Sequence, residues 1–368
     1  MIRPTMPTAH PAPTPPEGPR TPAGARRLRP VVRGVLLAAA LLVPHASAQS
    51  AGAFARFGLG ARATVVPVTG DLTGAASPYH NPALAPYQVG QALELTGGLL
   101  SFDREWQSVQ VSTPLRPRAG IAAGVIHGGT NDIDGRDRSG YATDTYSTDE
   151  YAFYAAFGVR LSDRVSGGAG LRLYRSQLFD GVQSPTALGA SLGLAAQVTD
   201  RLSAGFVVED LFARYEWNAS AAGGGVATDD FPTRLRAGAA YGLGQAPGGF
   251  SRGVVAADLE LMVERTDAAR PGGVDVIGTT PIERDSTADF AFATVGGRVG
   301  GEVWLAEPFA VRLGAERLGA GAFGEIRPAA GFALKTTLGE LNTRIDYTAT
   351  LEPFGTGVMQ MATLRLEL

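Results

Sequence analysis

The sequence has no cysteine, and after its first 48 residues it has no apolar run long enough to cross a membrane as a helix. Without thiols the chain can form no disulfide framework, no thiolate metal site and no lipid-modified cysteine anchor. A membrane helix needs about 20 consecutive, mostly apolar residues. The mean hydropathy of +0.04 is also low for a helical membrane protein. Beyond its first 48 residues the chain is therefore either soluble or a β-barrel.

The first 48 residues have the features of a cleavable export signal. A group of arginines precedes a short apolar stretch at residues 34–43, and residues 46–48 form a small-residue cleavage site. We predict a Sec-type signal peptide with a long Pro-rich extension, which exports the chain past the inner membrane of a Gram-negative bacterium. Its removal would take six arginines and one glutamate from 32 basic and 35 acidic residues. The resulting charge of −8 offers no basic surface for a nucleic acid.

Beyond residue 90 the sequence alternates between apolar and polar residues, most clearly near the C-terminus. Side chains on a β-strand point to opposite faces with a period of two. In residues 341–352 the odd positions are mostly apolar, among them Ile345, whereas the even positions include Asp346. One face suits lipid and the other suits water. The pattern recurs along the chain without a helical period, which favours an outer-membrane barrel over a soluble sandwich.

We therefore predict an all-β fold with a single antiparallel transmembrane β-barrel of about 14 strands. Short turns alternate with longer links, as at the periplasmic and extracellular ends of such barrels, and the even count returns both termini to one side. The predicted strands are residues 92–101, 105–114, 118–128, 148–161, 164–177, 185–198, 201–216, 232–243, 252–265, 290–305, 308–318, 325–337, 341–352 and 358–368.

The predicted inner face of this barrel collects charged side chains of both signs, while the opposite face collects large apolar residues such as Phe153, Leu171 and Leu259. Because the charges are mixed, we expect internal ion pairs rather than an ion-selective pore. The predicted lumen-facing charges are Arg160, Arg172, Glu209, Arg234, Arg236, Asp258, Glu260, Arg312, Glu316, Lys335, Arg344, Asp346 and Glu352.

Residues 49–90 do not alternate. Any strand there would be interrupted by Pro67, Pro78, Pro82 and Pro86. Irregular backbone at membrane depth survives only inside protein or along a wet cavity, which favours a plug within the barrel over the alternative of a periplasmic tail. We thus divide the chain into a signal at residues 1–48, an N-terminal hatch segment at residues 49–90 and a barrel at residues 91–368.

Several stretches of the chain share a pattern with a known family. In the N-terminal segment they are residues 51–54, 57–63 and 79–85, and in the barrel they are residues 149–153, 158–164, 209–217 and 231–238. From residue 51 to the end, the chain resembles the PorV/PorQ family, a branch of the FadL-like outer-membrane barrels. In FadL-like transporters the Asn-Pro-Ala triplet belongs to the hatch, so the resemblance assigns Asn81, Pro82 and Ala83 to a hatch here. The chain departs from the family at residues 64–67, where a Met-Gly-Gly-like turn is replaced.

The resemblance implies two functions. One is the passage or binding of small hydrophobic molecules across the outer membrane, with outer-membrane lipid and a hydrophobic small molecule as partners. The other is an accessory role in type IX secretion, with secretion components or secreted cargo as partners. An empty apolar lumen beside the hatch would favour transport. A filled lumen with a large exposed apolar patch on the outer loops would favour cargo binding.

Histidine is scarce, with only His80 and His127 after residue 48, which leaves little for a metal site or a Ser-His-Asp triad. His127 precedes acidic residues at 132, 134 and 137, so an outer-membrane hydrolase with an Asp–His pair is a remote alternative. The same acidic loop lacks the ligand spacing of an EF-hand. We expect no enzymatic activity, no catalytic residue, no metal and no cofactor.

Overall fold

The computed structural model describes residues 51–178, 184–218, 226–244, 252–270, 274–277, 280–283, 286–318, 326–352 and 356–368. Within these ranges no helix is long and apolar enough to cross a membrane. The predicted signal peptide lies outside the described residues.

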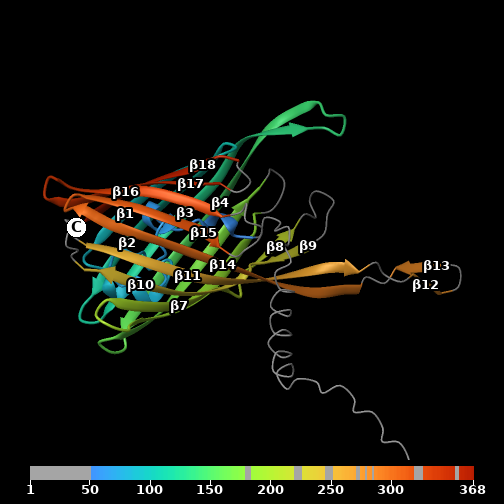
Figure 1. The fold of residues 1–368 in the computed structure, drawn as a ribbon. Coiled ribbons are helices and arrows are strands. Elements are labelled where there is room, and N and C mark those ends of the chain that lie inside the picture. The colour runs from blue at the N-terminus through green and yellow to red at the C-terminus, as the bar shows by residue number, and fades with distance from the viewer. Residues whose placement is uncertain are drawn as a thin grey trace, which may run out of the picture. The chain divides into compact units, whose positions relative to one another are not determined.

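Fourteen antiparallel strands form a closed barrel, which confirms the predicted fold (Figure 1). They are β1 Ala92–Leu100, β2 Arg104–Leu115, β3 Ala119–Arg136, β4 Ala142–Arg160, β5 Val165–Gln177, β6 Thr186–Gln197, β7 Leu202–Leu211, β10 Thr233–Leu243, β11 Arg252–Arg270, β14 Ser286–Ala306, β15 Phe309–Leu318, β16 Arg327–Leu338, β17 Leu341–Leu351 and β18 Val358–Glu367. Each strand pairs with the barrel strands that precede and follow it in sequence, and β18 pairs with β1. Closure removes the unpaired edge that an open sheet would expose.

The two ends of the barrel differ. Short turns follow β2, β4, β6, β14 and β16 at one end, which also holds the C-terminus and which we call the turn end. At the opposite end, the loop end, two hairpins extend away from the barrel, β3 with β4 and β11 with β14 (Figure 1). Residues 129–147 and 266–289, which the sequence suggests are loops, are therefore largely paired strand. The second region also contains a small sheet of β12 (Val274–Ile277) and β13 (Thr280–Glu283).

The prediction of one strand over residues 201–216 is wrong. β7 ends at Leu211, and the chain then forms a separate hairpin of β8 (Arg214–Asn218) and β9 (Val226–Asp230). Asp210 and Phe212 adopt positive φ angles of 60° and 64°, which a continuous strand does not accommodate.

Side chains alternate between the two faces of the wall. In β4, Ala152, Tyr154 and Ala156 are buried, whereas the intervening Phe153 is 48% exposed and Phe157 is 47% exposed. Large apolar residues are exposed on the outward face of other strands as well, including Leu95, Leu171, Leu188, Phe206, Leu259, Leu313 and Phe332. Such a band is what a wall facing lipid requires.

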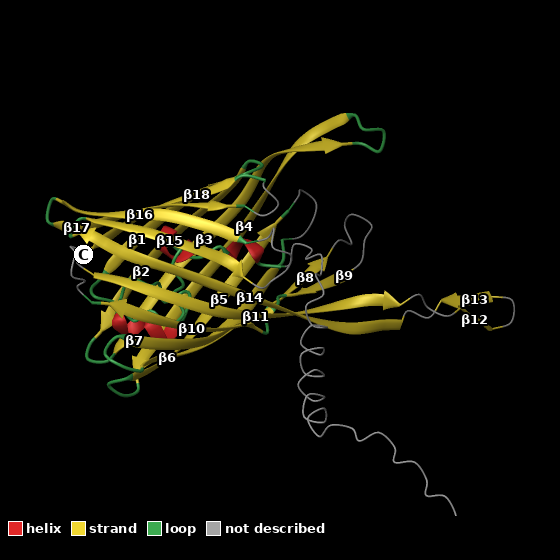
Figure 2. Ribbon diagram, viewed as in Figure 1, coloured by secondary structure: helices red, strands yellow, loops and turns green. Residues whose placement is uncertain are grey.

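The chain of residues 51–91, which we call the inserted segment, lies inside the barrel (Figure 2). It contains three short 3-10 helices, η1 Ala53–Arg56, η2 Ala61–Thr64 and η3 Pro82–Tyr87. η3 contacts the wall at β2 to β6, whereas η2 contacts it at β16 to β18, so the segment reaches across the lumen. Most of its side chains are buried as a result.

The outward face at β17 can be tested with one charge. Ile345 is 40% exposed, whereas Asp346 beside it is 1% exposed. Arginine on a lipid-facing strand costs about 2 to 4 kcal/mol near the bilayer midplane. We expect Ile345→Arg to fold poorly into lipid vesicles, measured by heat-modifiable electrophoretic mobility, and Ile345→Leu to fold normally. Equal folding of the two variants would contradict a lipid-facing surface at this position.

Candidate functional site

The residues of the predicted hatch, Asn81, Pro82 and Ala83, lie at the start of η3 against the wall. Oδ1 of Asn81 accepts a hydrogen bond from the backbone N–H of Ala83 at 3.1 Å and so caps the helix. Nδ2 of Asn81 donates to the backbone oxygens of Thr69 at 2.8 Å and Leu194 at 3.2 Å. This one side chain, which is 0% exposed, joins two parts of the inserted segment to β6.

Glycines on the inner face let the inserted segment approach the wall backbone closely. A Cβ added at Gly193 would lie 2.0 Å from Oδ1 of Asn81, and one at Gly158 would lie 2.4 Å from the backbone oxygen of Pro82. Side chains do not fit at such distances, so these positions accept only glycine unless the segment moves. We did not predict these close contacts between wall glycines and the inserted segment from the sequence. Their signal is a glycine at an inward-facing strand position, which marks a close backbone approach.

Two neighbouring carboxylates, Glu209 and Asp210, are both buried in the lumen, at 0% and 3% exposure. Strict alternation would send one of them outward. The pairing of β6 with β7 shifts register between Ala190 and Leu192, and Asp210 has a positive φ, so an extra residue on β7 turns both carboxylates inward. The sequence predicts Glu209 on the inner face but misses Asp210, because a bulge interrupts the period of two.

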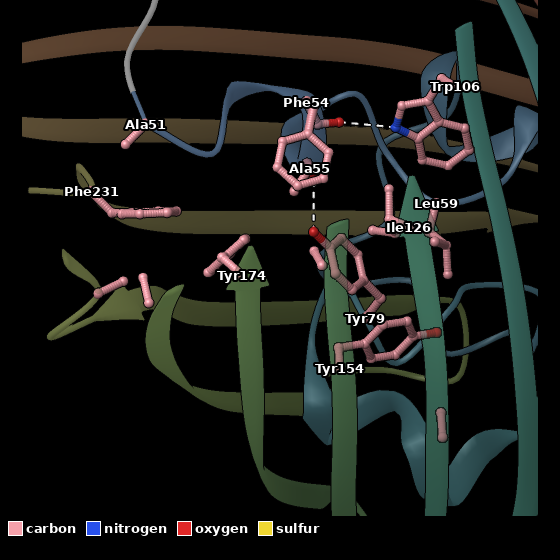
Figure 3. Close-up of a cluster of buried hydrophobic side chains, with 14 of the residues drawn as sticks. Ala51, Phe54, Ala55, Leu59, Tyr79, Trp106, Ile126, Tyr154, Tyr174 and Phe231 are labelled. Atoms are coloured by element: carbon pink, nitrogen blue, oxygen red, sulfur yellow. Dashed lines mark hydrogen bonds between the residues drawn. The ribbon is translucent and has the colours of Figure 1, made fainter. Parts of the chain in front are cut away.

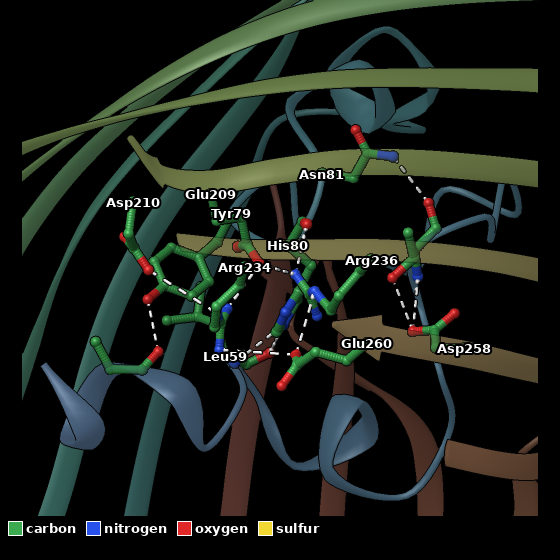
Figure 4. A network of polar contacts seen from close by, with 12 residues as sticks. Leu59, Tyr79, His80, Asn81, Glu209, Asp210, Arg234, Arg236, Asp258 and Glu260 are labelled. Carbon is green, nitrogen blue, oxygen red and sulfur yellow. Dashed lines mark hydrogen bonds and ion pairs between the residues drawn. The ribbon is translucent and has the colours of Figure 1, made fainter. Parts of the chain in front are cut away.

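Three arginines, one on β5 and two on β10, surround these carboxylates; Figure 4 shows the two on β10, Arg234 and Arg236. Nη2 of Arg172 lies 2.6 Å from Glu209, and the same atoms of Arg234 and Arg236 lie 2.6 Å and 2.8 Å from it. Nη1 of Arg172 lies 3.1 Å from Asp210. We call these five residues the Glu209 cluster. Buried charges are tolerated when they are paired in this way, and here the pairing joins three strands of the wall.

The Glu209 cluster also holds the inserted segment. Nη2 of Arg172 donates to the backbone oxygen of Tyr79 at 2.8 Å, and Nη2 of Arg236 donates to that of His80 at 2.8 Å. The guanidinium carbon of Arg172 lies 4.1 Å from the centre of the Tyr79 ring, a cation–π contact. Nε2 of His80 accepts the N–H of Leu59 at 3.0 Å, so this ring nitrogen has a structural role.

A second buried network, the Glu302 cluster, joins the inserted segment to β14, β15 and β17. It consists of Arg62, Asp71, Glu302, Arg312 and Asp346. Arg62 lies 2.8 Å from Asp71 and 3.1 Å from Glu302. Arg312 lies 2.6 Å from Glu302 and 2.6 Å from Asp346. Each carboxylate here has an arginine partner, which offsets its burial.

The other charges predicted for the lumen have separate partners. Asp258 accepts the hydroxyl hydrogen of Thr69 at 2.8 Å, which adds a further bond between wall and segment. The remaining contacts are Arg160 with the ring of Tyr87, Glu260 with Arg234 and Arg236, Glu316 with Arg298 and Arg327, Lys335 with the ring of Trp304, Arg344 with Asp346, and Glu352 with Arg104.

Aromatic side chains fill the lumen towards the loop end (Figure 3). Nε1 of Trp106 donates to the backbone oxygen of Phe54 at 2.9 Å, and the hydroxyl of Tyr79 donates to that of Ala55 at 2.6 Å. The same buried cluster contains Leu59, Ile126, Tyr154, Tyr174, Tyr215 and Phe231. We call it the aromatic cluster; it packs the first helix of the inserted segment against the wall.

Open space in the lumen is limited. A cavity between the inserted segment and Glu94, Arg344 and Thr363 holds only 10 Å³. Larger cavities of 390 Å³ and 380 Å³ lie at the loop end and the turn end. An apolar recess of 820 Å³ lies on the outward face of β2 to β6, lined among others by Val111, Ile121, Phe157 and Leu171. The inserted segment thus fills the middle of the lumen.

His127 faces outward and is paired with Asp149, not with the acidic residues at 132–137. Its Nε2 lies 2.8 Å from Oδ1 of Asp149, and its Nδ1 lies 3.1 Å from Oε1 of Gln107. With both ring nitrogens engaged, the histidine has no position left for activating a nucleophile. Among the described residues, no group of three or more His, Asp or Glu is placed to hold a metal ion.

No protein-family model and no curated protein sequence matches the chain. Solved structures do. The Pseudomonas putida toluene transporter TodX has a TM-score of 0.52 and 14% identity, covering 84% of this chain and 96% of TodX. The Ralstonia pickettii toluene transporter TbuX has a TM-score of 0.52 and 12% identity, covering 84% of this chain and 98% of TbuX. A Pseudomonas aeruginosa FadL homologue has a TM-score of 0.50 and 10% identity, covering 83% of this chain and 96% of the homologue. At these identities the likeness shows a shared FadL-like barrel fold.

The close contact between Gly193 on β6 and Asn81 can be tested by labelling a cysteine in the inserted segment. In the cysteine-free chain, Ala83→Cys should react slowly with a bulky maleimide, because Ala83 is 0% exposed, whereas Asp163→Cys at an open turn should react fast. Adding Gly193→Ala should raise the rate at position 83 at least tenfold, since its methyl displaces Asn81. Gly97→Ala is the control, because its Cβ meets nothing within 4 Å. An unchanged labelling rate with Gly193→Ala would contradict a close contact between Gly193 and Asn81.

The Glu209 cluster predicts a large stability effect from a small change. Glu209→Gln keeps the shape of the side chain but leaves three buried arginines without their shared carboxylate. Removing one partner of a buried ion pair costs about 3 to 5 kcal/mol. We expect a clear drop in the urea midpoint of unfolding in lipid. Glu260→Gln should have little effect, because its arginine contacts are 3.9 Å long. Equal losses would show that the cluster does not anchor the barrel.

Proposed function

We propose that the protein is an outer-membrane barrel for the passage or binding of small hydrophobic molecules. The observation that carries the proposal is the closed 14-strand barrel with an apolar outward face and an inserted segment in its lumen. The shared fold with two toluene transporters and a FadL homologue supports it.

In this proposal the apolar outward face contacts outer-membrane lipid, the turn end faces the periplasm and the loop end faces the cell exterior. Short turns and a C-terminus at one end, with long extensions at the other, are typical of bacterial outer-membrane barrels. Residues 1–48 would then serve as the export signal, residues 49–90 as the hatch segment and residues 91–368 as the barrel.

Passage requires the inserted segment to move, because the cavity beside it holds only 10 Å³. A hydrophobic molecule arriving from outside would first meet the aromatic cluster, whose ring faces suit an apolar ligand. Asn81, Pro82 and Ala83 would act as the hatch. Release of the Asn81 amide from the backbone of Leu194, together with loss of the glycine contacts of η3, would free η3 from the wall and open a path to the turn end.

A second candidate is the PorV/PorQ-type role, in which the barrel binds or hands over cargo of type IX secretion. The filled middle of the lumen favours it, because a barrel that only presents a surface needs no channel. The loop-end residues that would form such a surface lie partly outside the described ranges. For either role we propose no enzymatic step, since His127 is engaged at both ring nitrogens.

A reversible crosslink separates the two candidates. The hydroxyls of Thr64 on the inserted segment and Thr348 on β17 are 3.0 Å apart, so the Thr64→Cys/Thr348→Cys pair can form a disulfide in this cysteine-free chain. Cells that carry the oxidised variant should take up radiolabelled toluene several-fold more slowly, and a reductant should restore uptake. Transport through a moving hatch is the reason for this expectation.

The control crosslinks the wall alone. The hydroxyls of Thr96 and Thr363 are 2.8 Å apart on the paired strands β1 and β18, so their cysteine pair leaves the inserted segment free of a covalent link. Because Thr363 also accepts a hydrogen bond from the backbone N–H of Ala61 at 2.8 Å, the oxidised and reduced forms of the same variant are compared. Oxidation of this pair should not change uptake. If the Thr64–Thr348 crosslink also leaves uptake unchanged but the variant loses surface display of secreted proteins, the secretion role replaces the transport role.

A further inference from the structure

A cavity of 380 Å³ opens at the turn end, between the inserted segment and the inner face of β11, β14 and β16 to β18. Val89 and Ala75 of the inserted segment line one side. Four cationic side chains from four different strands line the other side, together with one tryptophan; they are Arg252, Lys335, Arg344, Arg365 and Trp304. Two carboxylates also line the cavity: Glu302, which is paired with Arg62 and Arg312, and Glu367, which lies 3.7 Å from Arg365.

Three of the cations occupy one row of the barrel wall. Lys335 on β16 pairs with Arg344 on β17, and Arg344 pairs with Arg365 on β18. Like charges directly opposite each other on neighbouring strands are destabilising. Two of the three are offset, because Arg344 lies 2.9 Å from Asp346 and Arg365 lies 2.7 Å from Glu94. The row therefore keeps one uncompensated charge, that of Lys335.

Lys335 and Arg252 have no carboxylate within ion-pair distance among the described residues. Both instead contact the same indole: Nζ of Lys335 lies 4.6 Å from the centre of the Trp304 ring, and the guanidinium carbon of Arg252 lies 5.1 Å from it. Nε1 of Trp304 donates to Glu302 at 3.2 Å, which fixes the ring. The Trp304 ring therefore holds two positive charges at the opening of the cavity, where only solvent screens their mutual repulsion.

The buried Arg365 provides a further unused donor. Its Nε has no hydrogen-bond acceptor within the described part of the chain and lies 3.7 Å from the carboxylate of Glu367. A buried N–H without an acceptor is destabilising. An acceptor with two or more oxygens in this cavity would satisfy it and would also neutralise the cationic pair.

We propose that this turn-end cavity binds an oxyanion, either a carboxylate or a phosphate, between Lys335, Arg252 and Arg365. Ammonium and guanidinium groups bind such oxygens by charge-assisted hydrogen bonds. The apolar side of the cavity, formed by Val89 and Ala75, leaves room for a short hydrocarbon chain attached to the anion. The site is independent of the proposed transport of hydrophobic molecules and would remain if that proposal failed.

Lys335 is the only lysine of the sequence, which makes the site directly observable. Reductive ¹³C-methylation keeps its positive charge and adds a single dimethyl-lysine resonance besides that of the N-terminus. Phosphate, hexyl phosphate and hexanoate are titrated into the full-length barrel in non-ionic detergent, at constant ionic strength with chloride as the balancing salt. We expect a saturable shift of this resonance. Tighter binding of hexyl phosphate than of phosphate by tenfold or more would identify an amphiphile head group, and equal binding a free oxyanion.

Variants assign the shift to the cavity. Arg252→Gln should weaken binding at least fivefold, because it removes one of the two cations on Trp304. Arg201→Gln, at the turn end but outside the cavity lining, should leave binding unchanged. In the unmethylated protein, bound anion should slow the acylation of Lys335 by an uncharged, amine-reactive acylating reagent. The proposal would be overturned if the resonance shifted linearly with anion concentration, shifted equally with chloride alone, and if the anions did not slow acylation of Lys335.

Discussion

Pairing of buried charge in the Glu209 cluster is the constraint on which the lumen depends. Three guanidinium groups and two carboxylates lie where water is largely excluded, so each needs a close partner of opposite sign. The bulge on β7 supplies the second carboxylate, Asp210; without it Arg172 would have only Glu209, which it shares with Arg234 and Arg236. With their charges compensated, Arg172 and Arg236 still have N–H groups for backbone oxygens of the inserted segment.

The same lumen is filled by backbone against backbone as well as by side chains. A Cβ at Gly120 would lie 2.0 Å from the backbone oxygen of Ala85, and one at Gly168 would lie 2.4 Å from the backbone carbon of Pro82. These contacts, with those of Gly158 and Gly193, concentrate on η3 and the residue before it. Dispersion contacts of this kind are individually weak and lost together when the packed surfaces separate, so η3 is held as a unit.

The period-two pattern was sufficient to predict the closed barrel of about 14 strands, because a lipid-facing wall requires an apolar residue at nearly every second position. It failed where local backbone overrides alternation, as at Asp210 and Phe212, where positive φ angles end β7 early. It also could not give the partners of each charge. Arg312 meets Asp346 from two strands away, and that pairing depends on strand register and shear, which no single strand sequence encodes.

The distribution of ion pairs bears on whether the inserted segment can leave its position. Arg62 and Asp71 both belong to the segment and would move together, while Glu302 would keep Arg312 as its partner. The Glu209 cluster consists of wall residues only, and it would lose backbone acceptors but no charge partner. Asp258 would lose its bond from Thr69, at a depth that water could reach once the segment had moved. The cost of displacement therefore lies in the contact of Arg62 with Glu302, in hydrogen bonds, worth about 0.5 to 1.5 kcal/mol each, and in the glycine contacts. Because neither Arg62 nor Glu302 would be left without a charge partner, this distribution suits a segment that moves better than an ion pair whose members have no other partner.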